Sequence, residues 1–262
     1  SISQSFAIED AYSTWGMYQG NAQHTAYVPI KINPKSIYQS WVVSIDEEKS
    51  SGLNKIHPAT IGSEHIIVSS TNYAYSNTLQ AFSIKDGHVV WSKDYGSAGV
   101  QPTAYNNHTV YVQAVNNSLG GTLLYAYNER NGDLIFQAPS TAQWHSYKAP
   151  VIDNGFIYAC SGYMSGINAY KMSSGSLLWS KSFNSLSENA TSAVNKQFLV
   201  YYNAGSLLKM DKASGEILSI TPDDAWSWDG YDDPTPVLMD EKAALIVTNK
   251  TLTRFNLQTD SI

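Results

Sequence analysis

The chain has 262 residues, and its 16 Lys and Arg against 22 Asp and Glu give a formal net charge of −6. This acidic balance argues against a nucleic-acid-binding protein, which needs clustered basic residues. Charged residues are only 15% and aromatic residues 12% of the chain, which is typical of an ordered, turn-rich β protein rather than a disordered one. No run of eighteen apolar residues occurs, so the sequence predicts no membrane span.

Cysteine use removes two further classes of protein. The single cysteine, Cys160, cannot form an intramolecular disulfide, and it cannot build a cysteine metal cluster. It lies in the β-rich run "IYACSG", which predicts a strand and a buried thiol.

Residues 1–45 form an N-terminal segment that lies outside the repeats of the rest of the chain. Within it, "SIYQSWVVSID" has the composition of a strand and carries one large aromatic, Trp41. We predict that this stretch is an isolated outer strand, which would close the last blade of a ring.

Residues 46–262 contain an internal repeat. Each copy has an apolar run, a turn and a second apolar run that carries a large aromatic, as in "LQAFSIKDGHVVW". The turn glycines are Gly87, Gly132, Gly175 and Gly215, spaced by 45, 43 and 40 residues. Another β-rich run, such as "HIIVSS" or "TVYVQAV", comes before each copy. Four short strands per unit of this length predict an all-β fold, a β-propeller of antiparallel blades.

The number of copies predicts four complete blades and a fifth that stops after its turn, where Asp260 takes the glycine position. Two architectures fit this count. The chain forms a five-bladed ring closed by its N-terminal strand, or it is a part, about five to six blades, of a seven- or eight-bladed ring. We favour the incomplete ring.

The aromatic residues after the turns predict contacts between blades. Trp91, Phe136 and Trp179 each stand four residues after a turn glycine. We expect Trp91 and Trp179 to be buried between adjacent blades, because a large ring on an outer strand can dock onto the next blade.

This repeat resembles the tryptophan-docking motif of the pyrroloquinoline-quinone (PQQ)-like propellers. Ala81, Gly87 and Trp91 match the motif fully, as do the corresponding residues of the third copy, whereas the second copy has Phe136 in place of tryptophan. The opening "WGMYQGNAQHTAYVP" is similar to a motif that precedes the first blade in secreted bacterial members, which are not dehydrogenases. The resemblance implies the fold but no particular activity.

The resemblance does not bring the cofactor with it. Quinoprotein dehydrogenases of this fold hold PQQ against a ring of two adjacent cysteines and use a calcium ion and a catalytic Asp, whereas this chain has one cysteine. We expect no PQQ and assign no catalytic residue. Calcium is left open, because an acidic stretch could supply oxygen ligands from Asp223, Asp224 and Asp229.

A second candidate site comes from the position of polar residues in the repeat. The connection that enters each innermost strand of a propeller faces the central channel, and there the sequence places a varied polar and aromatic set that suits a ligand or peptide. Its members are His57, Gln101, Trp144, His145, Lys148, Asn189, Asp232 and Asp233.

These observations lead to one function and two alternatives. We expect a non-enzymatic propeller scaffold that binds a protein partner or surface ligand outside the cytoplasm, in the periplasm, at the cell surface or secreted. A fragment of a PQQ- and calcium-dependent oxidoreductase is one alternative, and a carbohydrate-binding propeller is the other.

Overall fold

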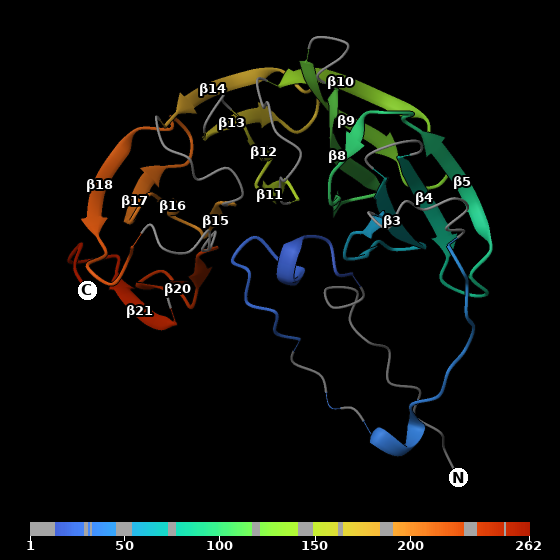
Figure 1. The fold of residues 1–262 in the computed structure, drawn as a ribbon, viewed down its shortest axis with the longest axis horizontal. Coiled ribbons are helices and arrows are strands. Elements are labelled where there is room, and N and C mark those ends of the chain that lie inside the picture. The colour runs from blue at the N-terminus through green and yellow to red at the C-terminus, as the bar shows by residue number, and fades with distance from the viewer. Residues whose placement is uncertain are drawn as a thin grey trace.

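The computed structural model describes residues 14–28, 31, 33–45, 54–72, 77–116, 121–140, 149–161, 165–183, 191–227, 235–248 and 250–262. In these residues the chain is built of antiparallel strands and two short 3-10 turns, η2 (Tyr18–Gly20) and η3 (Pro34–Ser36). Five separate sheets stand around a common centre in an open arc, with η2 near that centre (Figure 1). The predicted all-β propeller is confirmed.

We number the sheets as blades 1 to 5 in chain order. Blade 1 contains β1 (Asn54–Ile56), β2 (Thr60–Ile61), β3 (His65–Asn72), β4 (Thr78–Ser83) and β5 (Val89–Asp94). Blade 2 contains β6 (Gly99–Val100), β7 (Ala104–Asn106), β8 (Thr109–Asn116), β9 (Gly121–Asn128) and β10 (Leu134–Ser140). In both blades the innermost strand is split in two, because His57–Ala59 and Gln101–Thr103 interrupt its pairing.

In the other three blades the described residues contain one inner-strand segment each. Blade 3 contains β11 (Val151–Asp153), β12 (Phe156–Cys160), β13 (Gly166–Lys171) and β14 (Leu177–Ser182). Blade 4 contains β15 (Ala193–Val194), β16 (Phe198–Asn203), β17 (Ser206–Asp211) and β18 (Ile217–Pro222). Blade 5 contains β19 (Val237–Leu238), β20 (Ala243–Thr248) and β21 (Thr251–Asn256). The stretch 37–45, predicted as a strand, is not assigned to one. Cys160 lies in a strand as predicted, but it is partly exposed rather than buried because it is the last residue of β12.

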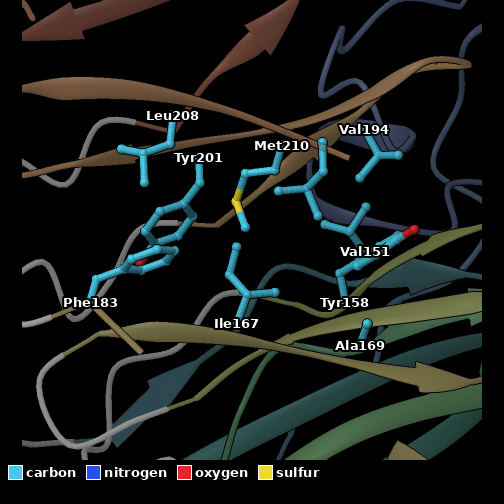
Figure 2. Close-up of a cluster of buried hydrophobic side chains, with 10 residues drawn as sticks. Val151, Tyr158, Ile167, Ala169, Phe183, Val194, Tyr201, Leu208 and Met210 are labelled. Atoms are coloured by element: carbon cyan, nitrogen blue, oxygen red, sulfur yellow. The ribbon is translucent and has the colours of Figure 1, made fainter. Parts of the chain in front are cut away.

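The core lies between neighbouring blades rather than inside one sheet. Between blades 3 and 4, Tyr158 and Ile167 of one blade pack against Tyr201 and Met210 of the other, all at most 2% exposed (Figure 2). The rings of Phe183 and Tyr201 stack with their centroids 5.2 Å apart. Each blade therefore buries its faces mainly against its neighbours, as expected for a repeat architecture, and Met17 and Ala22 of the N-terminal segment add to the core between blades 3 and 4.

The turn glycines receive the aromatic rings of the preceding outer strand. A Cβ built on Gly132 would lie 2.9 Å from the indole of Trp91, and one on Gly215 would lie 2.6 Å from that of Trp179. The indole of Trp91 also donates a hydrogen bond to the Glu129 carbonyl at 2.6 Å. The absence of a side chain on these glycines gives room to the ring, and their positive φ forms the turn.

The same contact recurs at the other turns with variations. Phe136 lies against Gly175, and Trp41 lies against Gly87, with its indole donating to the Ile84 carbonyl at 3.0 Å. Trp91 is buried, whereas Trp179 is half-buried, which is less than the sequence predicts for that ring.

Blades 4 and 5 are joined by a polar contact at the corresponding place. Ser219 stands where the aromatic would be, and Asp260 stands where the glycine would be. The Asp260 carboxylate accepts hydrogen bonds from Lys209 Nζ at 2.5 Å and Ser219 Oγ at 2.8 Å. The hydrogen bond from Lys209 holds the pKa of Asp260 below its ordinary value. In the fourth copy, where the repeat pattern weakens, a hydrogen-bonded polar contact thus replaces the contact of an aromatic ring with a glycine.

Candidate functional site

The N-terminal segment crosses the centre of the arc and binds the inner strand of every blade. We call residues 15–24 the strap. Trp15 and Ile61 exchange two backbone hydrogen bonds, of 2.9 and 3.0 Å. The next residue, Gly16, accepts a hydrogen bond from the Tyr105 amide at 2.6 Å. Two consecutive residues of the strap therefore hold blades 1 and 2.

The strap then continues to the remaining blades in chain order. The Ile152 amide of blade 3 donates to Met17 Sδ at 3.2 Å. The Val194 amide of blade 4 donates to the Ala22 carbonyl at 2.8 Å, and the Leu238 amide of blade 5 donates to the Gln23 carbonyl at 2.9 Å. The blue segment at the centre of Figure 1 is this strap.

The five donors are equivalent positions of the repeat. Each is the inner-strand residue that pairs with the second residue of the following strand, as Ile61 pairs with Ile66 and Tyr105 pairs with Val110. We call these amides the hub amides; they belong to Ile61, Tyr105, Ile152, Val194 and Leu238. A buried amide without an acceptor costs about 1–3 kcal/mol. The strap supplies an acceptor for one such amide in each blade.

Local chemistry explains why this sequence forms a strap. A Cβ on Gly16 would lie 2.6 Å from the Tyr105 carbonyl oxygen, so only glycine allows this approach. After η2, the Asn21 side chain accepts hydrogen bonds from the amides of Gln23 and Thr25, at 3.1 and 3.2 Å. This Asx turn reverses the chain toward blades 4 and 5. His24, buried beside it, donates through Nδ1 to the Pro236 carbonyl at 3.0 Å.

Two residues of the predicted channel set are described, and both lie inside the protein. His57 and Gln101 stand at the interruptions of the inner strands of blades 1 and 2 and are 6% and 1% exposed. His57 Nε2 lies 3.3 Å from Thr71 Oγ1, and the Gln101 carbonyl accepts a hydrogen bond from Ser69 at 2.9 Å. Ligand binding at these two residues stays a prediction.

The other members of that set lie outside the described residues: Trp144, His145, Lys148, Asn189, Asp232 and Asp233. Asp229 of the predicted calcium set lies there too. Across the part of the chain that the structure does describe, no three His, Cys, Asp or Glu side chains gather as a metal site would need.

Asp223 is a buried carboxylate between blades 4 and 5. It accepts hydrogen bonds from the hydroxyls of Tyr202 at 2.9 Å and Thr248 at 3.2 Å, and it lies 3.4 Å from that of Thr253. Its neighbour Asp224 is exposed. The hydroxyl contacts give Asp223 a role in blade packing, and calcium binding by this stretch stays a prediction.

A second buried carboxylate, Glu129, joins blades 1 and 2 and is not among the residues predicted from the sequence. It is fully buried. Five groups lie within hydrogen-bonding distance of its carboxylate: Ser63 Oγ (2.8 Å), the Glu64 amide (2.8 Å), the His65 amide (3.2 Å), Tyr105 Oη (3.0 Å) and His108 Nδ1 (3.1 Å). The signal available in the sequence was the adjacent charged residues Glu129 and Arg130 at the end of the otherwise apolar and neutral "LLYAYNERNG".

Ser63, His108 and Glu129 have the residue types of a hydrolase triad but not its geometry. Ser63 Oγ and the Glu129 carboxylate both approach the same imidazole nitrogen, Nδ1 of His108, at 3.0 and 3.1 Å. A triad needs the serine and the carboxylate on opposite ring nitrogens, so that the imidazole can take the serine proton. This cluster therefore ties blades together and does not activate a nucleophile.

We predict that Glu129 makes the fold sensitive to acid. Burial alone would raise the pKa of this carboxyl, but hydrogen bonds donated by the Glu64 amide, Ser63, Tyr105 and His108 outweigh it and lower the pKa. A lowered pKa stabilises the fold above the ordinary value of about 4.3, and this contribution is lost as pH falls. Glu129→Gln should lower the free energy of unfolding by about 2 kcal/mol at neutral pH, measured by urea titration, and the difference should shrink below about pH 4.

Glu64→Gln is the matched control, because Glu64 lies in the blade 1 turn whose backbone amide donates to Glu129. Glu64 is exposed and pairs with exposed Arg130 at 2.7 Å, so its substitution should change stability by less than about 1 kcal/mol. Equal losses from the two variants, or a loss from Glu129→Gln that grows as pH falls, would contradict the role given to Glu129.

The repeated blades, the aromatic rings on turn glycines and the strand register define a propeller of PQQ-like repeats. A family model described as "Outer membrane protein assembly factor BamB" matches residues 32–145, 56–221 and 120–256. The chain belongs to this family. No curated protein sequence matches it. Among the described residues, no helix has the length and apolar character needed to cross a membrane.

Solved structures of similar fold include a BamB protein, a dehydrogenase and a designed protein. BamB from Moraxella catarrhalis has a TM-score of 0.54 and 11% identity, over 74% of this chain and 55% of its own. A europium-containing methanol dehydrogenase has a TM-score of 0.60 and 12% identity, over 94% and 58%. The computationally designed Ika8 protein has a TM-score of 0.60 and 11% identity, over 78% and 58%. The chain thus spans a little over half the length of these structures, and at such identities the likeness concerns the fold alone.

Proposed function

We propose that this chain is part of a non-enzymatic propeller scaffold that binds protein partners outside the cytoplasm. The observation that carries the proposal is the strap. It places the chain's own backbone at the inner end of each blade, where its carbonyls and the Met17 sulfur accept from the hub amides. A propeller whose inner strand ends are bound by its own chain has those groups committed to structure, which favours recognition through its other surfaces.

The family also supports a protein-binding scaffold outside the cytoplasm. Its model is described as an outer-membrane protein assembly factor, which is a role in the cell envelope among other proteins. The location outside the cytoplasm and the binding of proteins come to this chain from that description. The fold alone does not choose between scaffold and enzyme, because a methanol dehydrogenase shares it.

Exposed positions on three surfaces allow a direct test of the scaffold. Lys85 lies in the hairpin before β5, Asp224 follows the far end of β18, and Leu134 begins the outer strand β10 with 51% of its surface exposed. A photo-crosslinking residue placed at each position in turn, in cells that make the protein, should capture a defined envelope protein from one surface and not from the others. If none of the three positions captures a protein, the scaffold proposal is contradicted.

The alternative function, a PQQ-dependent oxidoreductase, predicts that the protein binds PQQ and oxidises alcohols. PQQ is a flat polyanion, and the family's dehydrogenases hold it against paired cysteines, whereas this chain has only Cys160. We expect no PQQ binding and no dye-linked oxidation of simple alcohols, with or without calcium. Absorbance titration measures the first and dye reduction the second. Calcium-dependent binding with a Kd of about 1 μM or tighter would favour the enzyme.

A further inference from the structure

The chain contains two Asn-Gly dipeptides, Asn131-Gly132 and Asn154-Gly155. In such a pair the glycine amide nitrogen can attack the asparagine side-chain carbonyl carbon. A C–N bond forms, ammonia leaves, and water then opens the cyclic imide to aspartate or isoaspartate. Glycine favours the reaction because it has no side chain to hinder the ring closure and turns freely. The two pairs are chemically alike, so their surroundings decide how they differ.

Asn131-Gly132 is held in place on all sides. The Gly132 amide, which would be the nucleophile, donates to the Asn128 carbonyl at 2.9 Å. Gly132 is buried under the indole of Trp91. The Asn131 side chain donates to the Asp133 carboxylate at 2.7 Å and accepts from the Asp133 amide at 3.0 Å. Ring closure there requires the docked turn to open.

Asn154-Gly155 is far less constrained. The two residues form the tight turn between β11 and β12, with φ of 43° and 85° and the pair Asp153 and Phe156 closing it. Both residues are exposed, and a Cβ on Gly155 would meet nothing within 4 Å. The Asn154 side chain makes one contact among the described residues, a hydrogen bond donated to the adjacent Asp153 at 3.2 Å. The Gly155 carbonyl accepts a hydrogen bond from the Met172 amide at 2.7 Å, but no aromatic ring covers this glycine as Trp91 covers Gly132.

We propose that Asn154 is a site of spontaneous deamidation in the folded protein and that Asn131 is protected by the docking of Trp91. The reaction consumes one water molecule and releases one ammonia, and it needs no other reactant. It converts the amide donor of Asn154 into a carboxylate beside Asp153. Asp153 pairs with Lys212 at 2.7 Å and so joins blades 3 and 4, and the isoaspartate product also adds a backbone atom to the two-residue turn. The modification therefore falls on a contact between blades.

Peptide mapping by mass spectrometry tests the proposal on the intact protein. After incubation at mildly alkaline pH, the peptide with Asn154 should deamidate at least about ten-fold faster than the peptide with Asn131. The reason is that the turn at Asn131 must open locally before its ring can close. In denaturant the two rates should converge, since the dipeptides are the same. The variant Trp91→Ala should raise the rate at Asn131 and leave that at Asn154 unchanged. Equal rates in the folded protein, or a faster reaction at Asn131, would overturn the proposal.

Discussion

Trp91→Ala should lower the free energy of unfolding by about 3–5 kcal/mol, the usual cost of deleting a large buried aromatic ring. Trp91 is 8% exposed, fills the space over Gly132, and donates a hydrogen bond to the Glu129 carbonyl at 2.6 Å. Its removal leaves a cavity between blades 1 and 2 and a carbonyl without its donor. Urea or guanidinium titration followed by tryptophan fluorescence and circular dichroism measures the loss.

Blade 2 supplies the matched control for this experiment, because Phe136 occupies the corresponding place. Trp91→Phe keeps a ring over Gly132 and loses the indole hydrogen bond, so it should cost about 1–2 kcal/mol. The same loss from Trp91→Ala and Trp91→Phe would show that the hydrogen bond, and not the packed ring, joins the blades. A loss under about 1 kcal/mol from Trp91→Ala would contradict the docking account altogether.

Gly16→Ala should be the most damaging small substitution in the strap. The added Cβ would lie 2.6 Å from the Tyr105 carbonyl oxygen, which is backbone and cannot swing away. The strap must shift, and the Tyr105 amide then loses its acceptor. Overpacking and an unsatisfied buried amide together predict a loss of about 2–4 kcal/mol in unfolding free energy, measured by denaturant titration.

Gly121→Ala is the control for adding one methyl group. A Cβ on Gly121, which begins β9, would meet nothing within 4 Å, so this variant should match the wild type within about 1 kcal/mol or gain slightly from a less flexible unfolded chain. Similar stability of the two alanine variants would mean that the strap contributes little.

Most of the fold could be predicted from the sequence, because each blade repeats its own local signals. The turn glycines and the following aromatic marked the hairpins, and the structure explains why alanine belongs to the same motif. Ala81 and Trp91 are cross-strand partners, as are Ala126 and Phe136. A small residue opposite the ring leaves it free to lean onto the next blade. Where Ser219 replaces the aromatic, its partner is Lys209, and the contact becomes ionic.

The strap and the buried carboxylates could not be predicted in the same way. The opening motif was noted as a resemblance, but its hydrogen bonds reach strands as far away in sequence as Leu238, and no local pattern encodes such a partner. Glu129 has no motif around it, and Asp223 is predicted from the sequence only as a calcium ligand, yet both are buried among donors from two blades. Gly16 was the one local signal for the strap, since it forms no turn and so must permit a close approach.

Hydrogen exchange at the hub amides tests the central claim, that the protein's own strap holds the inner ends of the blades. In the wild-type protein the amides of Ile61, Tyr105, Val194 and Leu238 should be as well protected as those of the buried strands. In Gly16→Ala their exchange should accelerate together, while the amides that pair β4 with β5 keep their protection. Hub amides that exchange as fast as exposed turns in the wild type, or that do not respond to the substitution, would contradict the account.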